Sequence, residues 1–389
     1  MFSDRTNWKL TRNRFTKALE EVRAAGREVL DLSISNPTRA GFDYDQAAVL
    51  AALASPRAMD YDPQPKGLLE AREAVSGYYG EQQATTGLDP EQLILTTSTS
   101  EGYSYIFRLL CNPGDEVLIP KPSYPLFEFL ADLQDVKLVP YPLIYDHGWQ
   151  IDFPSIAKAV SPLTRAVVVV HPNNPTGSYV KPNERDALNR LCAEHDLALV
   201  GDEVFLDYAH DGRSRSSLAL NREVLTFTLS GLSKVSALPQ MKVAWMVASG
   251  PEAQWKDAVA RLEVIADTYL SMNAPMQWAV PILLEQRKDI QRQLLDRVLA
   301  NLAEVDRQLP AGRACQRLAV EGGWYAVLRV PVTESDEDLT IELLRNKSVL
   351  VHPGHFYDFP GEGHLVLSLI GPKGEFAEGI RRVLEMVDG

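Results

Sequence analysis

Four polar stretches of the sequence directly follow short apolar runs and carry side chains capable of chemistry. They are TSTS at 97–100, HPNNPTG at 171–177, GDE at 201–203 and SGLSK at 230–234. Hydroxyls and free backbone amides at the start of a helix suit an anion such as phosphate. A buried carboxylate such as Asp202 needs a cationic or hydrogen-bonded partner to stay ionised. A desolvated lysine such as Lys234 has a lowered pKa and becomes a nucleophilic amine.

Each stretch alone also has an ordinary structural explanation. Residues 97–100 could be a plain helix cap, Asn174 part of a tight turn, Asp202 half of an ion pair, and Lys234 a surface lysine. Together they supply a phosphate cup, an amide donor, a buried carboxylate and an activated amine. Pyridoxal phosphate requires these groups, because a carboxylate keeps its ring nitrogen protonated and a lysine holds its aldehyde carbon.

The elements that would position these residues alternate along the chain. Apolar or β-branched runs lie at 93–96, 116–120, 136–139, 165–170, 197–200, 225–229 and 243–247, and helical patterns at 101–110, 125–133 and 183–195 separate many of them. This alternation predicts an α/β fold with a mostly parallel seven-stranded sheet covered by helices on both faces. Ligands bind at the carboxyl ends of such strands, so the four polar stretches are expected along one edge of the sheet.

The pattern changes near 275–281, where long helices begin, notably at 290–309. Strand-like pieces at 324–330 and 364–369 and a helix at 375–387 follow. The chain opens with an amphipathic helix that places Phe15, Leu19 and Val22 on one stripe. We therefore expect a second, smaller α+β domain that the N-terminal segment joins.

Bulk properties exclude several classes of function. The 389 residues include 39 basic and 52 acidic ones, a net charge of −13, which argues against general binding to nucleic acid or to an anionic membrane. Three widely spaced cysteines form no CxxC pair, and no apolar run of 18 residues occurs. His352, His355 and His364 lack the defined fourth ligand of a metal site. A cytoplasmic protein without a metal is expected.

On these residues the chain resembles the class I and II aminotransferases of pyridoxal-phosphate fold type I, such as aspartate, alanine and tyrosine aminotransferases. The shared motifs, in order, are YDPQPKG (61–67), TSTSEG (97–102), NPGDEV (112–117), PSYP (122–125), NNPTG (173–177), DEV (202–204) and SGLSK (230–234). The resemblance implies amino transfer from an amino acid or amine to a 2-oxo acid. It also implies a homodimer, a large cofactor-binding domain over 40–275, and a small domain built from 1–39 and 276–389.

The resemblance further implies a role for each site residue. Lys234 would form a Schiff base with pyridoxal phosphate and carry the transferred proton. Asp202 would pair with the ring nitrogen, Asn174 would donate to the phenolic oxygen, and Tyr124 would stack on the ring. Tyr61 would reach across the dimer interface to the phosphate in the partner subunit. The phosphate would be surrounded by Ser98, Thr99, Ser100, Ser230, Ser233 and Lys242.

Two departures from the family pattern concern the cofactor. Phe205 stands where a tyrosine usually donates to the phenolic oxygen, which predicts a raised pKa of the Schiff base, unless Tyr208 takes over. Lys242 stands where an arginine usually binds the phosphate. A lysine supplies the positive charge but cannot form the bidentate hydrogen bonds of a guanidinium group.

Two further departures concern the substrate. Val366 occupies the expected position of the arginine that binds the substrate's α-carboxylate, and no arginine lies between positions 346 and 380. Ser35 replaces a glycine that is common beside the substrate. With Phe205, Val366 motivates an alternative hypothesis, in which the same cofactor serves a lyase, decarboxylase or cyclase. A non-catalytic binder built on this fold is a third hypothesis, which the acidic charge disfavours.

Overall fold

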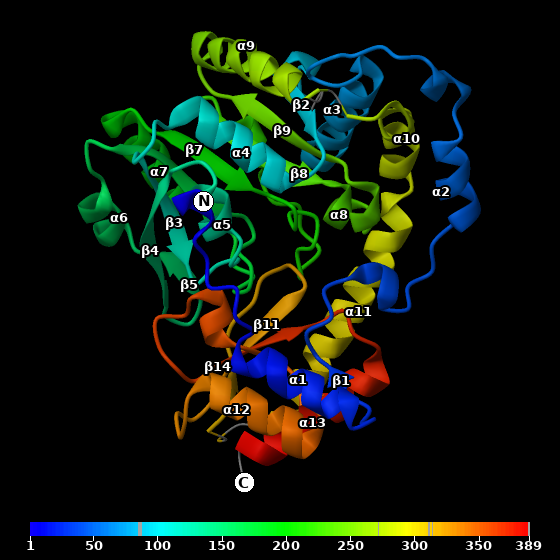
Figure 1. The fold of residues 1–389 in the computed structure, drawn as a ribbon, viewed down its shortest axis with the longest axis vertical. Helices are drawn as coiled ribbons and strands as arrows, with labels where there is room; N and C mark the ends of the chain where they lie inside the picture. Colours follow the sequence, from blue (N-terminus) through cyan, green and yellow to red (C-terminus); the bar gives the residue numbers. More distant parts are fainter. Residues whose placement is uncertain (85–87, 271, 310–311, 313, 388–389) are drawn as a thin grey trace.

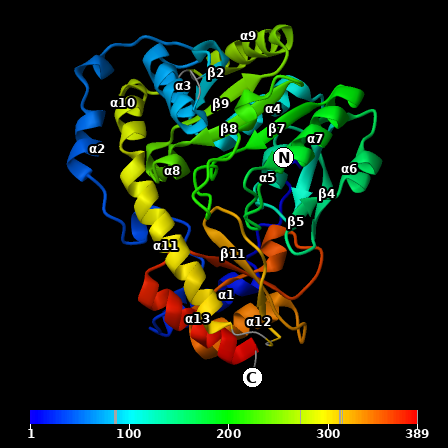
Figure 2. The same ribbon diagram turned by 180° about the vertical axis from the view of Figure 1, so that it is seen from behind.

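The computed structural model describes residues 1–84, 88–270, 272–309, 312 and 314–387. Figure 1 shows two layered parts, a large twisted sheet wrapped in helices and a smaller group of strands and helices beneath it. Helix α11 (Arg287–Gln308) runs along the side from the first part to the second, as Figure 2 shows from behind. The N-terminal segment packs within the second part.

Within the described residues the large sheet has eight strands in the order β2-β9-β8-β7-β6-β3-β4-β5. Their bounds are β2 (Leu93–Thr96), β3 (Glu116–Lys121), β4 (Lys137–Tyr145), β5 (Trp149–Ile151), β6 (Thr164–Val170), β7 (Ala198–Asp202), β8 (Thr226–Gly231) and β9 (Ala244–Ser249). The pairs within β4-β3-β6-β7-β8 are parallel, whereas β9 and β5 pair antiparallel with their neighbours. The predicted α/β class is confirmed, and β5 adds a short eighth strand.

Both faces of this sheet are covered, because its strands are apolar on both sides. Val168 packs with residues of α4 (Thr99–Leu110), α5 (Phe127–Asp132) and α9 (Glu252–Thr268). The adjacent Val167 points to the opposite face, where α6 (Phe153–Ala159) and α7 (Pro182–His195) lie. Helices α2 (Gln46–Leu53), α3 (Leu69–Gln83) and α10 (Ala274–Glu285) cover the β2-β9 end. The strand ends are thereby fixed rigidly.

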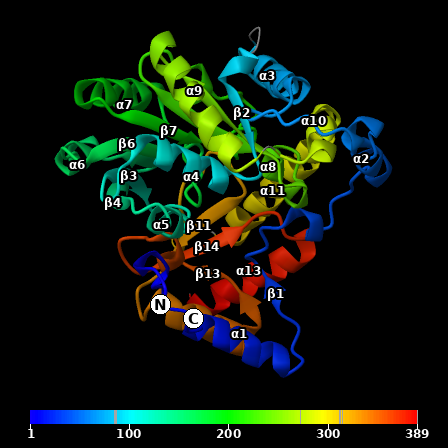
Figure 3. The same cartoon turned by 45° about the horizontal axis from the view of Figure 1, so that its top comes forward.

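The second part is built around a four-stranded sheet with the order β10-β11-β14-β13. Its elements are β10 (Gln316–Arg317), β11 (Tyr325–Arg329), β13 (His352–Pro353) and β14 (His364–Ser368), with helices α1 (Arg14–Ala24), α12 (Asp336–Glu342) and α13 (Lys373–Val387). Strand β1 (Leu30–Asp31) pairs with β12 (Val349–Leu350), so the two ends of the chain pack together. Figure 3 shows this sheet between the large sheet and helices α1 and α13.

Among the described residues, no helix combines the length and the apolar character that crossing a bilayer would require. The same part of the chain contains no group of three or more His, Cys, Asp or Glu side chains arranged to hold a metal ion.

Candidate functional site

A cavity of about 300 Å³ lies at the carboxyl ends of the parallel strands, where the second part meets the large sheet. All predicted site residues except Ser230 and Tyr61 line it. The lining consists of Ser35, Thr97, Ser98, Thr99, Ser100, Tyr124, Val170, Asn174, Asp202, Val204, Phe205, Ser233, Lys234, Pro239, Lys242, Val243, Ala244 and Tyr325. Side chains from five strand ends and from both terminal segments therefore meet at one place.

Lys234 enters the cavity from α8 (Leu232–Val235), the short helix that follows β8. Its Nζ lies 4.7 Å from the ring centroid of Trp324 and 5.3 Å from that of Phe205. No hydrogen bond or ion pair to this amine is present in the described part of the chain. Burial lowers the pKa of Lys234 to about 8, and the negative charge of Asp202 partly opposes this shift. The neutral, nucleophilic form of the amine is therefore far more populated near neutral pH than for an ordinary lysine.

Asp202 ends β7 and faces the same cavity. Its carboxylate accepts hydrogen bonds from the backbone N–H of Val204 and from the hydroxyl of Tyr103, each at 3.2 Å. Burial raises the pKa of Asp202 to about 6, while these two donors and Lys234 oppose the shift. The group is mostly ionised at pH 7 and offers a fixed negative charge to a cationic ring nitrogen.

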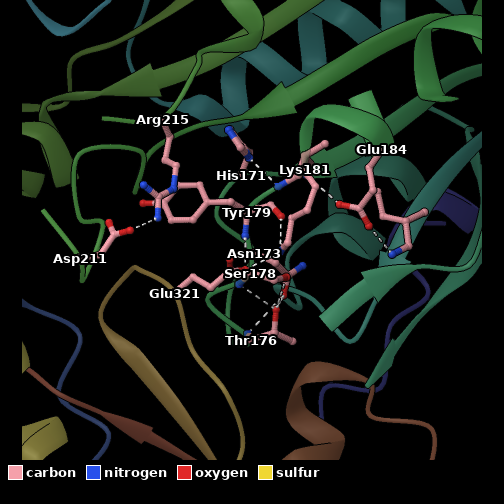
Figure 4. Close-up of polar contacts among 12 residues, drawn as sticks. His171, Asn173, Thr176, Ser178, Tyr179, Lys181, Glu184, Asp211, Arg215 and Glu321 are labelled. Carbon is pink, nitrogen blue, oxygen red and sulfur yellow. Dashed lines mark hydrogen bonds and ion pairs between the residues drawn. The ribbon is translucent and has the colours of Figure 1, made fainter. Parts of the chain in front are cut away.

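The loop that carries Asn174 is held by a dense set of hydrogen bonds, which Figure 4 shows in part. The side chain of Asn173 accepts from the hydroxyl of Thr176 at 2.9 Å, and the N–H of Gly177 donates to the Asn173 carbonyl at 2.7 Å. The N–H of His171 donates to the carbonyl of Asp202 at 2.7 Å, so the loop is tied to β7. The buried Oδ1 of Asn174 has no partner among the described residues. The amide oxygen of Asn174 is therefore available to a ligand.

The start of α4 lies on another wall of the cavity and has the donor arrangement that suits an anion. Ser98 caps the helix by accepting from the N–H of Glu101 at 3.1 Å, and the Glu101 carboxylate accepts from the N–H of Thr97 at 2.6 Å. The N–H groups of Thr99 and Ser100 belong to the first turn, where a helix leaves donors without an internal partner. Together with Ser233 and Lys242, these groups form a cup that suits a phosphate.

Three residues considered from the sequence lie elsewhere. Ser230 is buried within β8, and its hydroxyl is directed to the carbonyl of Glu203, 3.5 Å away. Ser230 is not among the residues that line the cavity, so its contact with phosphate stays a prediction. Tyr61 is 83% exposed and lies outside the cavity. The hydroxyl of Tyr208 donates to the carbonyl of Lys234 at 2.7 Å, so Tyr208 does not replace the tyrosine missing at Phe205.

The second part contributes Ser35 and Tyr325 to the lining of the cavity, and this wall carries no positive charge. Val366 lies in the middle of β14, opposite Val327 and His352, and is 1% exposed. Among the lining residues the only cations are Lys234 and Lys242. Val366 is not among the lining residues, and the lining contains no guanidinium group.

Two aromatic residues at this wall were not foreseen as site residues. Tyr325 lines the cavity, and Trp324 lies against Lys234. The sequence predicted a strand at 324–330 that includes both residues, but it did not indicate that they lie at the site. The one available signal is the string GGWY at 322–325, in which two adjacent aromatic residues follow two glycines.

The fold and the cavity define an enzyme of pyridoxal-phosphate fold type I. A buried lysine without a polar partner, a hydrogen-bonded carboxylate, a buried unpartnered amide and the polar start of α4 together fit this cofactor. The chain matches the family model described as aminotransferase class I and II over residues 27–382, and it therefore belongs to this family. It is a pyridoxal-phosphate-dependent aminotransferase, as predicted, and nothing in these similarities favours a lyase, decarboxylase or cyclase.

Individual relatives are consistent with this assignment. The chain is 29% identical over 369 residues to glutamate-pyruvate aminotransferase AlaA of Haemophilus influenzae, covering 92% of this chain and 90% of that protein. It is 28% identical to alanine aminotransferase of Mycobacterium tuberculosis, covering 93% and 86%. The solved alanine aminotransferase of Pyrococcus furiosus shares the fold with a TM-score of 0.88 at 24% identity, covering 99% of each chain.

Proposed function

We propose that Lys234 is the residue that bonds to the aldehyde carbon of pyridoxal phosphate and that moves the proton during amino transfer. The observation that carries this proposal is the environment of the Lys234 amine. The amine is buried, has no polar partner in the described structure, and belongs to the lining of the cavity. The lowered pKa of about 8 makes this amine a competent base. Bound pyridoxal phosphate supplies an electron sink for the bond broken at the substrate's α-carbon.

The surrounding residues hold the cofactor in this proposal. The Asp202 carboxylate pairs with the ring nitrogen, and the Asn174 amide binds the phenolic oxygen. Tyr124, which is 46% exposed because it borders the cavity, covers the ring face. The phosphate lies in the cup formed by Ser98, Thr99, Ser100, Ser233 and Lys242. Lys242 follows the 3-10 helix Pro239–Met241, and its backbone is left-handed with φ of 53°. It is one of the residues that line the cavity.

Borohydride reduction of the holoenzyme, followed by peptide mass mapping, tests the central assignment. We expect the reduced cofactor on the peptide that contains Lys234, and none on that peptide in Lys234→Ala. A reduced adduct on a different lysine would refute the proposal. In parallel, adding an amino donor should convert the cofactor's absorbance to that of the amine form.

The amino donor and acceptor are proposed to be an α-amino acid and a 2-oxo acid. Support comes from the relatives, which are named as alanine and glutamate-pyruvate aminotransferases. A panel that pairs alanine or glutamate with pyruvate or 2-oxoglutarate, read by coupled product formation, tests this assignment. If all four combinations are silent while another amine converts the cofactor, the substrate assignment is wrong.

We also propose a homodimer in which Tyr61 reaches the phosphate of the partner subunit. A hollow of about 590 Å³ beside Tyr61 is lined by Arg57, Met272 and Trp278, among others. Large exposed apolar side chains lie on the elements around it; they include Met59 (87% exposed), Leu69 (42%), Tyr269 (51%), Leu270 (71%) and Ile282 (43%). Several such side chains exposed together are typical of an interaction surface.

Mixing two inactive variants tests the shared site directly. A heterodimer of Lys234→Ala and Tyr61→Ala contains one site in which both residues are intact, if Tyr61 serves its partner. We expect activity to return on mixing the two proteins under conditions that exchange subunits. Activity that stays absent, or a monomer by analytical ultracentrifugation, would contradict the proposal.

The remaining expectations concern organisation and location. We propose that the large domain spans 40–275 and the small domain 1–39 and 276–389, which the packing of β1 on β12 supports. Limited proteolysis with cuts outside the vicinity of residues 40 and 275 would argue against these bounds. A cytoplasmic location is proposed from the composition, and fractionation of producing cells tests it.

A further inference from the structure

The segment at 319–325 connects β10 to β11 and reaches from the second part up to the large sheet, where it is visible in orange in Figures 1 and 2. Its backbone is hydrogen-bonded to the large sheet's loops at Glu321 and Gly323. The N–H of Glu321 donates to the carbonyl of Gly177 at 3.2 Å, and its carbonyl accepts from the N–H of His210 at 2.9 Å. The N–H of Gly323 donates to the carbonyl of Tyr208 at 2.9 Å. The segment is therefore attached to two loops of the large sheet.

A side-chain contact reinforces this attachment. The carboxylate of Glu321 forms an ion pair with Nζ of Lys181 at 2.5 Å and accepts from the N–H of Tyr179 at 3.2 Å. Figure 4 shows Glu321 and Lys181 converging beneath the Tyr179 ring. The guanidinium of Arg215 lies 4.9 Å above that ring. The pair joins residues that are 140 positions apart in the chain.

Close backbone packing leaves little freedom at this contact. A Cβ added at Gly177 would lie 2.3 Å from the side chain of Val320 and 2.5 Å from the carbonyl oxygen of Gly322. A Cβ added at Gly322 would lie 2.6 Å from the hydroxyl oxygen of Tyr179. The two glycines therefore allow the segment to approach the asparagine loop, residues 171–177, closely. This close packing fixes the position of the residues that follow Gly322 and Gly323.

Those next residues are the two aromatic side chains at the site. Trp324 is fully buried, and its carbonyl accepts from the N–H of Leu369 at 2.7 Å. Its ring lies 4.7 Å from Nζ of Lys234 and contacts the rings of Phe205 and Tyr208 edge-on, each at 5.1 Å between centroids. The ring thus forms a floor beneath the lysine amine.

We propose that Trp324 is a positioning residue for Lys234, and that the Glu321–Lys181 ion pair fixes the position of its ring. An aromatic face attracts an ammonium group and at the same time excludes water from it. The amine consequently stays directed into the cavity instead of turning towards solvent. The inference rests on the proposed function of Lys234. Besides the uncharged ring, the charge of Asp202 also acts on this lysine, and it raises the pKa of the amine.

The pKa of Lys234 in the cofactor-free protein provides a test that does not depend on catalysis. It is measured as the pH dependence of acetylation of Lys234 by acetic anhydride, followed by mass spectrometry. Trp324→Leu keeps the site apolar but removes the aromatic face, so we expect the pKa to fall by about half to one unit. Trp324→Phe retains a ring and is expected to stay close to the unmodified protein.

The ion pair is tested with variants on both sides. Glu321→Ala and Lys181→Met are each expected to shift the pKa of Lys234 in the same direction as Trp324→Leu, and the double variant Glu321→Ala/Trp324→Leu no further than Trp324→Leu alone. In the holoenzyme, each single variant is expected to slow the first half-reaction roughly tenfold through misplacement of the amine, without weakening donor binding. Asp306→Ala is the matched control, because it removes an exposed ion pair with Arg317 at the base of the same segment.

These experiments distinguish failure of the ring's role, of the ion pair's role and of the proposed function. An unchanged pKa of Lys234 in Trp324→Leu refutes the role of the ring. Additive shifts in the double variant, or an equal shift in Asp306→Ala, refute the role of the ion pair. If borohydride places the cofactor on another lysine, the proposed function fails, whatever the pKa measurement shows.

Discussion

Two sheets face the same cavity and contribute to it in different ways. The carboxyl edge of the large sheet provides Asp202, the asparagine loop, Lys234 and the start of α4, which are groups with charge or free hydrogen-bonding capacity. The four-stranded sheet provides Tyr325 and, against the lysine, Trp324, which carry no charge. Its strand β14 has a buried valine at position 366.

On the proposed function, this difference divides the site into a half that would hold the cofactor and a half that would face the substrate. The first half fits pyridoxal phosphate through fixed charges and oriented dipoles, which are effective because they need no reorganisation during the reaction. The second half offers aromatic surface and hydroxyl groups where a bidentate cation would normally recognise a carboxylate. We therefore expect the large sheet to set the chemistry of the enzyme and the second part to set its choice of substrate.

The strongest test of this division is the loss of Lys234. In Lys234→Ala we expect the rate of the first half-reaction to fall by roughly ten-thousandfold, because both the covalent attachment and the base are removed. Stopped-flow absorbance with a saturating amino donor measures this rate. Lys242→Met serves as a control in the same cavity and should weaken cofactor binding while largely retaining the rate at saturating cofactor. Equal losses in both variants would contradict distinct roles.

Removing the charge of Asp202 should have the next largest effect. Asp202→Asn is expected to reduce the rate about a hundredfold, by analogy with the loss of one fixed electrostatic contact. The carboxyl has a raised pKa of about 6. It is therefore ionised above pH 6 and becomes protonated as the pH falls through 6, when it can no longer pair with a cationic ring nitrogen. Cofactor affinity, followed by fluorescence titration, should weaken below pH 6 in the unmodified protein but not in Asp202→Asn.

Placing a cation at position 366, on the strand that pairs with β11, would sharpen the comparison. In Val366→Arg we expect KM for an α-amino acid to fall about tenfold, because a charged hydrogen bond to the carboxylate is gained. An amine without a carboxylate should show no such gain, and Val366→Met controls for the longer side chain. Thermal unfolding verifies that the variant is folded. If KM falls equally for both donors, the valine is not the reason for the uncharged wall.

The smallest effect is expected at Phe205, whose ring lies 5.3 Å from the lysine amine. Phe205→Tyr should lower the pKa of the Schiff base by about half to one unit, because the new hydroxyl can donate to the cofactor's phenolic oxygen. A spectrophotometric pH titration measures this shift. Tyr208→Phe is the control, since the Tyr208 hydroxyl already donates to the Lys234 carbonyl. An unchanged titration in Phe205→Tyr would reject the idea.

Most of the large sheet and of the cofactor half could be predicted from the sequence, for a local reason. Each parallel strand is a short apolar run, and each functional group follows such a run within a few residues. Asp202 and Lys234 are therefore placed by the strands that precede them. Strand β5 was missed because three residues beside a turn form too short a pattern. Spacing alone could not show that the Ser230 hydroxyl is buried within β8, outside the lining of the cavity.

The substrate half could not be predicted in the same way. Trp324 lies against Lys234 on a segment in which Glu321 contacts Lys181 and which Gly177 and Gly322 allow to approach closely. These contacts join segments far apart in the chain, and no local motif specifies them. Sequence reasoning identified the missing arginine at Val366 but could not show that aromatic side chains occupy that wall.

The position of Trp324 and Tyr325 late in the sequence has a consequence for biosynthesis. The lysine, the carboxylate and the phosphate cup are all translated well before the segment that completes the pocket. A nascent chain can thus assemble the large sheet while its amine is still open to water and to other aldehydes. Stable uptake of the vitamin-derived cofactor is expected only after residue 325 has left the ribosome, so maturation of this enzyme should be a late, nearly post-translational event.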